Sequence, residues 1–480
     1  MKTTLKIIFV KFGFLVTNMM IFLILHLSDY NLKYLMFGSF IQIITIFVYI
    51  YFMKPSFLSI SIIFFLFSYV FHFGQVIINI FEFNDIFRHR SVYNLTNEIY
   101  YKNALIYSIY CHFFIAIGIK YTKNYLNESN KSEKKYIINF DNFNEGKFRK
   151  IILIIFTISI GPLIYLDISK ISALMNSGYL STYDVYSTGI EKYFYIFSSF
   201  ARSSITLLII SFRKNERISK IILLTSTLYF FIMMASGDRG TNIIYIITNL
   251  FIYYKLVKKL SVSKIICFAI LGYFVLGMLS SLTIMRTNED MSFSTLLETF
   301  NLRSDQGVLY STFREFGFTL ISLVYSIQFT GSINDFNYGM SYIASFLGVI
   351  PKIPSILSEY VENSFTFTKT FPINYQASLG GSYLGELYFN FGWIGIFFSY
   401  FIGSLLNFLD NVVEKSVINN KVIPLSICAI LLPNLLLWTR GFFVEISFEI
   451  FWFSLIFIFS FSKYYKGVKN DEKSLDRISR

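Results

Sequence analysis

Charged residues are scarce in this sequence of 480 residues. Asp, Glu, Lys and Arg together make up 15% of it, whereas ordinary soluble domains contain about 25%. Cysteine and histidine are also rare, with 3 and 4 residues. The cysteines all lie in apolar stretches, where a thiol packs as a small hydrophobic group. The numbers and spacing of these residues exclude a disulfide framework and a Cys/His zinc site.

Apolar and aromatic residues are abundant instead. Hydrophobic types reach 54% of the chain and aromatic types 20%, with 57 Phe and 35 Tyr. A soluble fold has too little interior to bury so much apolar surface. Disorder is excluded as well, because disordered chains are poor in aromatic residues. The composition therefore predicts an integral membrane protein, and long apolar runs predict that it is all-α.

About twelve apolar stretches have roughly the 20 residues that a helix needs to cross a bilayer. No small-x-small cleavage site follows Leu27, so we expect the first span to be retained. An even number of spans places both termini on the same side of the membrane. The stretches are Ile7–Leu27, Tyr34–Met53, Phe57–Ile80, Tyr101–Ile119, Ile151–Ile168, Tyr193–Phe212, Ile221–Ser236, Thr241–Tyr254, Ile265–Met285, Leu384–Leu409, Val422–Trp438 and Ile446–Ser462.

The positions of Lys and Arg predict the orientation, because cytoplasmic loops of membrane proteins are enriched in these residues. With the amino terminus inside, the inner segments hold about twice as many Lys and Arg as the outer segments. Both termini are therefore expected in the cytoplasm. The net charge of +13 then reflects this topology, and no nucleic-acid partner is expected.

One predicted outer segment is much longer than the others. It contains two apolar runs, Phe313–Phe329 and Tyr338–Ile350, which are too short or too interrupted to cross a membrane and are typical of re-entrant or interfacial helices. Pro351 and Pro354 end the second run, because proline lacks the amide donor that a helix needs. We expect four parts: nine spans in residues 1–285, a large, partly helical extracytoplasmic loop in residues 286–382, three spans in residues 383–462, and a cytoplasmic tail in residues 463–480.

Several ionised side chains lie within or beside the predicted spans, where each costs roughly 2.5–3.5 kcal/mol on insertion scales. Guanidinium groups bind phosphate oxygens bidentately, so arginines that converge at the outer end of a helical bundle would form an anion pocket. Glycines on both sides of such a residue let the backbone approach a ligand closely. The residues concerned are Arg202 within a span and, on the predicted outer side, Asp238, Arg239, Arg286, Arg314, Glu315, Glu386, Arg440 and Glu445.

Each of these residues also has a structural explanation. An arginine at the end of a span commonly extends to the lipid head groups. Asp238 could pair with Arg239 or cap the helix that follows it. Glu386 could be a carboxylate paired with an arginine, and Arg202 could be an internal ion-pair partner. Histidines within the spans more often pack or hydrogen-bond than take part in chemistry.

Three segments combine such charges with glycine and aromatic residues. They are Ser236-Gly-Asp-Arg-Gly240, then Arg314-Glu-Phe-Gly317 with an apolar run and Tyr338-Gly-Met-Ser-Tyr342 up to Ile350-Pro351, and Gly380-Gly-Ser-Tyr-Leu-Gly-Glu-Leu-Tyr-Phe-Asn-Phe-Gly392. At these segments the chain resembles the O-antigen polysaccharide polymerase (Wzy) family, the oligosaccharide repeat-unit polymerases of bacterial envelopes. The layout of many spans with one large late outer loop extends this resemblance over nearly the whole chain.

The resemblance implies a multi-pass enzyme of the bacterial cytoplasmic membrane that joins repeat units carried on undecaprenyl pyrophosphate. The terminal hydroxyl of the acceptor attacks the anomeric carbon of the donor, and lipid pyrophosphate leaves. The family is expected to resemble metal-independent glycosyltransferases, in which cationic side chains stabilise the departing charge. No cofactor is expected, and a chain-length regulator and a flippase are the expected protein partners.

The resemblance also assigns roles to residues. Related ligases are expected to use a histidine of the outer loop as the general base, but residues 286–382 contain none, so a carboxylate near the membrane boundary is expected to replace it. The assignments are pyrophosphate binding by Arg239, Arg314 and Arg440 with Arg286 as the next candidate, general base catalysis by Glu315 or Glu386, and support from Asp238, Arg202 and Tyr383.

Three other functions remain open from the sequence. A flippase or transporter for lipid-linked oligosaccharides fits the twelve spans, but would favour charged residues in a midplane cavity and short loops on both sides. A ligase that moves finished glycan to another acceptor would share the same chemistry. A channel or structural membrane protein would leave the outer arginines without a role.

Overall fold

The computed structural model describes residues 2–54, 58–80, 91–120, 144–177, 191–234, 238–258, 308–349, 366–376, 379–458 and 460. The regular secondary structure of these residues is helical, and the β-pairing among them is an isolated bridge between Thr330 and Asn334. The all-α prediction is therefore confirmed. Outside the described residues lie the predicted ninth span Ile265–Met285, Arg286, Pro351, Pro354 and the tail in residues 463–480.

The described residues of the predicted spans are predominantly helical, and one span, Leu384–Leu409, is divided between two helices. The protein is a multi-pass membrane protein, whereas the total of twelve spans stays a prediction. In the described part of the chain, five segments are long and apolar enough to cross a membrane: Leu5–Leu27, Leu32–Met53, Ile60–Ile80, Glu145–Ala173 and Tyr383–Ile418.

The chain forms two compact units, each assembled from separate stretches of sequence. Unit 1 comprises residues 1–123, 267–411 and 434–447, and unit 2 comprises residues 124–266, 412–433 and 448–480. Because the stretches alternate along the chain, residues that are close in the sequence can belong to different units.

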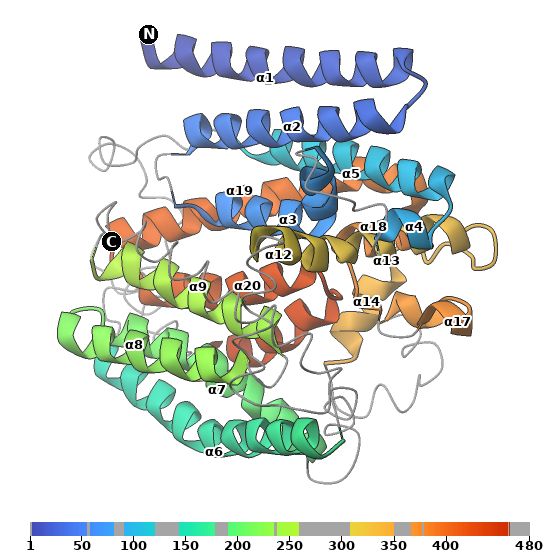
Figure 1. Cartoon of the computed structure of the whole chain (residues 1–480). Helices are drawn as coiled ribbons and strands as arrows, with labels where there is room; N and C mark the ends of the chain where they lie inside the picture. The colour runs from blue at the N-terminus through green and yellow to red at the C-terminus, as the bar shows by residue number, and fades with distance from the viewer. Residues whose placement is uncertain are drawn as a thin grey trace, which may run out of the picture. The chain divides into compact units, whose positions relative to one another are not determined.

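Unit 1 is a bundle in which α2 packs against α1, α3 and α5, while α13 packs against α3, α5 and α18 (Figure 1). Its elements are α1 (Lys2–Leu27), α2 (Leu32–Met53), α3 (Ile60–Ile80), α4 (Val92–Leu95), α5 (Glu98–Gly118), α12 (Val308–Phe316), η5 (Gly317–Thr319), α13 (Leu320–Phe329), α14 (Met340–Leu347), η6 (Phe367–Thr370), α17 (Ile373–Gln376), α18 (Tyr383–Phe391), η7 (Gly392–Ile394) and the first part of α19 (Gly395–Ile418).

The first apolar run of the predicted outer loop is a broken helix, α12–η5–α13. The break lies where Gly317 meets Gly74 of α3: a β-carbon on Gly317 would lie 2.5 Å from the Gln75 amide nitrogen. Beyond it, nearly every residue of α13 is buried. Burial among α3, α5 and α18 favours the re-entrant alternative for this run over an interfacial one, because an interfacial helix keeps one face in water.

The predicted span Leu384–Leu409 differs from the sequence expectation, because two helices share it. The α18 helix ends at Phe391, and Gly392 follows with φ +56°, a conformation that glycine adopts without a β-carbon clash. After η7 the chain resumes as α19. The interruption makes α18 a separate nine-residue helix whose residues from Tyr383 to Asn390 are all buried.

An ion pair ties together the predicted cytoplasmic end of unit 1. The Lys54 ammonium lies 3.3 Å from the Asp410 carboxylate and donates a hydrogen bond to the Asn407 side-chain oxygen at 2.8 Å. Asp410 also accepts hydrogen bonds from the Ile60 amide and the Ser61 hydroxyl. Both charged side chains are almost fully buried, so this network links the end of α2 and the start of α3 to α19.

Unit 2 packs α7 against α6, α8 and α9. Stacked Phe230 and Tyr245 rings, with centroids 5.7 Å apart, form its apolar core together with Ile205. Asn249 accepts a hydrogen bond from Thr206 at 2.7 Å, which is typical of polar groups between membrane helices. Its elements are α6 (Glu145–Ser177), α7 (Glu191–Ser211), α8 (Glu216–Met233), α9 (Arg239–Leu256), most of α20 (Val422–Trp438) and the helical residues 448–458.

Candidate functional site

Glu386 is the most deeply buried of the predicted site carboxylates. Its side chain is fully buried on α18 and accepts three hydrogen bonds: from the Ser341 hydroxyl at 2.8 Å, the Trp438 indole at 2.9 Å and the Phe443 backbone amide at 3.0 Å. The partners of this carboxylate are therefore neutral donors from α14, from the last residue of α20 and from the segment after α20. The structural explanation given above expected an arginine instead.

Asn390, one turn further along α18, extends this network. Its amide nitrogen donates to the Ser341 hydroxyl at 2.8 Å, and its amide oxygen accepts from the Gly339 backbone at 3.0 Å. The Tyr338 amide also donates to the Asn390 carbonyl at 2.9 Å. The start of α14 is thus fixed on α18, so that Tyr338–Tyr342 and Gly380–Gly392, two of the predicted motif segments, lie together in unit 1.

Arg440 is exposed on a turn beside the other end of α18. Its guanidinium stacks over the Phe71 ring of α3, 5.5 Å from the ring centroid. The turn reaches this position because it packs directly on glycine backbone: a β-carbon on Gly381 would lie 2.1 Å from the Gly441 carbonyl oxygen. Gly380 is held in turn by the Ser322 hydroxyl of α13, which donates to its carbonyl at 2.6 Å.

Arg314 and Glu315 lie on α12, which packs against α3. The Arg314 carbonyl accepts a hydrogen bond from the Gln75 amide at 3.0 Å, and its guanidinium lies 5.9 Å from the Tyr310 ring. Phe71 and Gln75 are one turn apart on α3, so the Arg314 and Arg440 segments both contact the same face of that helix. Glu315 is exposed, and Arg314 is half-buried.

A second charged cluster lies in unit 2 and contains Arg202 and Asp238. The Asp238 carboxylate is at the N-cap position of α9, 3.5 Å from the Lys170 ammonium and 4.0 Å from the Arg202 guanidinium. Arg202 also lies 3.7 Å from Asp167, and it is thus an ion-pair partner, as one structural explanation proposed. Arg239 follows as the first residue of α9 and is 7% exposed.

Opposing effects act on the Asp238 carboxyl group. Burial raises its pKa, but the positive charges of Lys170 and Arg202 outweigh the burial, so that the pKa lies below its ordinary value. Asp238 is therefore a carboxylate at neutral pH and a counterion for these cations. The ion pairs of this cluster thus join two cations, Lys170 and Arg202, to two acids, Asp167 and Asp238.

The histidines within the spans hold a polar network that the sequence reasoning missed. The Nδ1 of His72 can only donate to the Ser68 carbonyl, at 2.9 Å, so its Nε2 accepts from the Ser382 hydroxyl at 2.8 Å. Ser68 also contacts His112 Nε2 at 2.7 Å and the Tyr383 hydroxyl at 2.8 Å. The sequence signal for this network was the presence of histidines within the predicted spans, because ionisable residues are rare in membrane helices and usually have partners there.

The predicted site residues therefore fall into two sets. Unit 1 holds Arg314, Glu315, Tyr383, Glu386 and Arg440, while unit 2 holds Arg202, Asp238 and Arg239. The convergence of the outer arginines on one pocket stays a prediction. Among the described residues, no group of three or more His, Cys, Asp or Glu side chains is placed to hold a metal ion.

Replacing Gly381 by alanine tests how the Arg440 turn is positioned. The added methyl group would collide with the Gly441 backbone, and a strained contact of this kind costs about 1–3 kcal/mol. We expect the melting temperature of the purified protein to fall by a few degrees. Gly13→Ala is the matched control, because a β-carbon there meets nothing within 4 Å. Equal melting temperatures for both variants would contradict the packing described here.

Comparison with known proteins identifies a family. The sequence model of the family described as "O-antigen polysaccharide polymerase Wzy" matches residues 6–469, which is nearly the whole chain and includes both units. No match was found among curated proteins or among solved structures.

Proposed function

Because the chain belongs to the O-antigen polysaccharide polymerase (Wzy) family, we propose that it joins lipid-linked oligosaccharide repeat units by glycosyl transfer on the outer face of the bacterial cytoplasmic membrane. The observation that carries this proposal is the family match over residues 6–469. Membership supports a role in O-antigen polymerisation and a glycosyltransferase-type activity. The carrier lipid, the membrane face and the cytoplasmic position of both termini belong to the proposal.

The proposed reaction transfers a growing glycan from one carrier lipid to a repeat unit on another. The terminal hydroxyl oxygen of the acceptor forms a bond to the anomeric carbon of the donor. The bond from that carbon to the pyrophosphate oxygen breaks, and undecaprenyl pyrophosphate leaves with the electron pair. The hydroxyl proton passes to a carboxylate. The enzyme must therefore stabilise a leaving diphosphate and provide a base.

Arg440 and Arg314 are the proposed ligands of the diphosphate within unit 1. Arg440 is exposed, so its guanidinium can reach a lipid-borne head group, and stacking on Phe71 keeps one of its faces fixed. Arg314 borders the same face of α3. Fixed arginines would supply the charge stabilisation, and on this ground the proposed reaction is metal-independent. We also propose that Arg239 binds the diphosphate, with Arg286 as the next candidate.

Glu315 is the favoured base of the two predicted carboxylates. It is exposed on α12, next to Arg314. Glu386 would have to break three hydrogen bonds inside unit 1 before it could meet a sugar hydroxyl. We therefore assign Glu386 a positioning role: it joins α18 to the segment that follows Trp438, which carries Arg440. Tyr383 supports the same helix through its hydrogen bond with Ser68.

A strain that lacks this protein provides the test of function. We expect single repeat units to accumulate on the carrier lipid outside the membrane, because export continues while joining stops. Single units trapped inside would instead identify a flippase, and long chains retained on the carrier would identify a ligase. Lipid-linked glycans can be separated by mass and assigned to a membrane face by their accessibility to an added glycosidase. Restoration of polymer by the wild-type chain is the control.

A further inference from the structure

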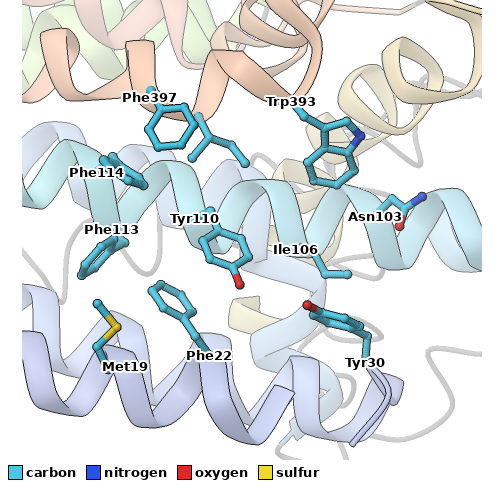
Figure 2. A pocket seen from close by; sticks show the side chains of 11 residues that line it. Met19, Phe22, Tyr30, Asn103, Ile106, Tyr110, Phe113, Phe114, Trp393 and Phe397 are labelled. Carbon is cyan, nitrogen blue, oxygen red and sulfur yellow. The ribbon is translucent and has the colours of Figure 1, made fainter. Parts of the chain in front are cut away.

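A cavity of about 620 Å³ lies in unit 1 between α1, α5 and the η7–α19 segment (Figure 2). Aromatic rings from all three elements form its walls: Phe22 from α1, Tyr110, Phe113 and Phe114 from α5, and Trp393 and Phe397 from η7 and α19. None of the site residues described above lines it. Its lining is predominantly apolar, so it suits a hydrocarbon ligand.

The cavity runs along the axis of the spans. Its α5 lining begins at Asn103 and ends at Phe114, which is about 16 Å of helix and roughly half of the 30 Å hydrocarbon thickness of a bilayer. Figure 2 shows Asn103, Tyr30 and Trp393 at one end and Met19, Phe113 and Phe397 at the other. An occupant must therefore be an extended chain that lies parallel to the helices.

The two ends of the cavity differ in polarity. Tyr30 and Asn103 bring polar groups to the predicted outer end. The turn after α1 holds Tyr30 at φ +52°, a conformation that is rare for a bulky side chain and that persists only where the surrounding structure favours it. The deeper part is lined by rings and by Met19. A cavity that is polar at its outer end and apolar further in fits a lipid whose head group lies at the outer surface and whose chain extends inward.

We propose that this cavity binds the head-proximal isoprene units of the polyprenyl chain of the carrier lipid. The inference rests on the proposed function, which requires such a lipid at the outer face. The methyl branches and double bonds of such a chain can make close dispersion contacts with the aromatic rings that line the cavity. The cavity thereby holds the carrier by its chain, separately from the arginines proposed to bind its diphosphate.

Photolabelling of the purified full chain tests this assignment. The probe is an undecaprenyl phosphate with a diazirine near its phosphate, in nanodiscs of phosphatidylethanolamine and phosphatidylglycerol. We expect labelled peptides from the α1 and α5 lining, and their loss with excess unlabelled undecaprenyl phosphate. A parallel arm uses a diazirine-bearing phosphatidylglycerol, which should label the lipid-facing helices instead. Equal labelling of the cavity by both probes, or no undecaprenyl label there, would overturn the inference.

Variants make the test specific to the cavity. Ile106→Trp fills it and should lower the undecaprenyl label by about tenfold, because little apolar surface remains for a chain to bury. Ile44→Trp is the matched control, since Ile44 is half exposed on α2 and does not line the cavity. Phe397→Ala removes one ring of the cavity wall and should also weaken labelling. Because the Phe397 side chain is 63% exposed, this substitution leaves the buried core intact.

Labelling is measured without polymerisation, so the two proposals fail separately. An unlabelled cavity in a chain whose deletion strain accumulates external single units overturns the inference and leaves the proposed function standing. If the cavity is labelled but deletion of the protein leaves polymer unchanged, the proposed function is overturned and the lipid-binding inference stands. Unchanged labelling in Ile106→Trp, with normal protein amount and elution, would also overturn the inference.

Discussion

Arg440→Ala is expected to lower polymer formation by about 10²- to 10³-fold, the effect of removing one charge-stabilising donor from a transition state. The side chain is exposed and contacts the Phe71 ring, so its removal leaves no buried group without a partner, and the protein should remain in the membrane at its normal level. The measurement is glycan chain length in the complemented deletion strain, together with the amount of membrane-inserted protein.

A conservative variant and a control variant make this prediction specific. Arg440→Lys retains the charge but not the bidentate geometry, so we expect an intermediate loss. Arg217→Ala removes another exposed arginine, at the start of α8 on the predicted cytoplasmic side, and should leave chain length unchanged. Wild-type chain length in both Arg440→Ala and Arg314→Ala would refute diphosphate binding by these residues.

Glu386→Ala should have the largest effect on folding. The substitution leaves the Trp438 indole, the Phe443 amide and the Ser341 hydroxyl without their acceptor, and each buried unsatisfied group costs about 1–3 kcal/mol. We expect a strong fall in folded protein, measured by size-exclusion chromatography after detergent extraction. Glu386→Gln keeps an oxygen for the indole and the amide, while its nitrogen can donate to Ser341, so most of the protein should remain folded.

The glutamine variants separate the two carboxylates. If Glu386 positions the Arg440 turn, the Glu386→Gln protein should still make polymer, because its hydrogen bonds are largely retained. Glu315→Gln should behave in the opposite way, with a normal amount of protein and little polymer, since an amide cannot accept the hydroxyl proton. A folded Glu386→Gln protein without any polymer would instead return the role of base to Glu386.

The sequence predicted most of the helices of this protein. It did not predict where those helices are interrupted. A run of about 20 apolar residues is sufficient to predict a span. The separation of α18 from α19 at Gly392 and the burial of α13 depend on what packs beside them: Gly392 has a left-handed φ, and Gly317 meets Gly74 of a distant helix. A single glycine in an apolar run carries no such information.

The candidate site shows the same limit. Charges near span ends pointed to Arg440, Glu386 and Arg202, because an ionised group in a membrane needs a partner or a function. Their partners were harder to predict. The Glu386 carboxylate is held by an indole and by a backbone amide that come more than 50 residues later, and a backbone amide has no signature in the sequence.

The discontinuous make-up of unit 1 also has a consequence for biogenesis. Its last stretch, residues 434–447, supplies both the indole and the amide that satisfy Glu386. Because the ribosome delivers the chain from its amino terminus, α18 is synthesised before the two hydrogen-bond donors, the Trp438 indole and the Phe443 amide, that later satisfy its carboxylate. The bundle that begins with the first helix is therefore completed only near the end of translation, and a chain released before Phe443 lacks the amide that satisfies Glu386.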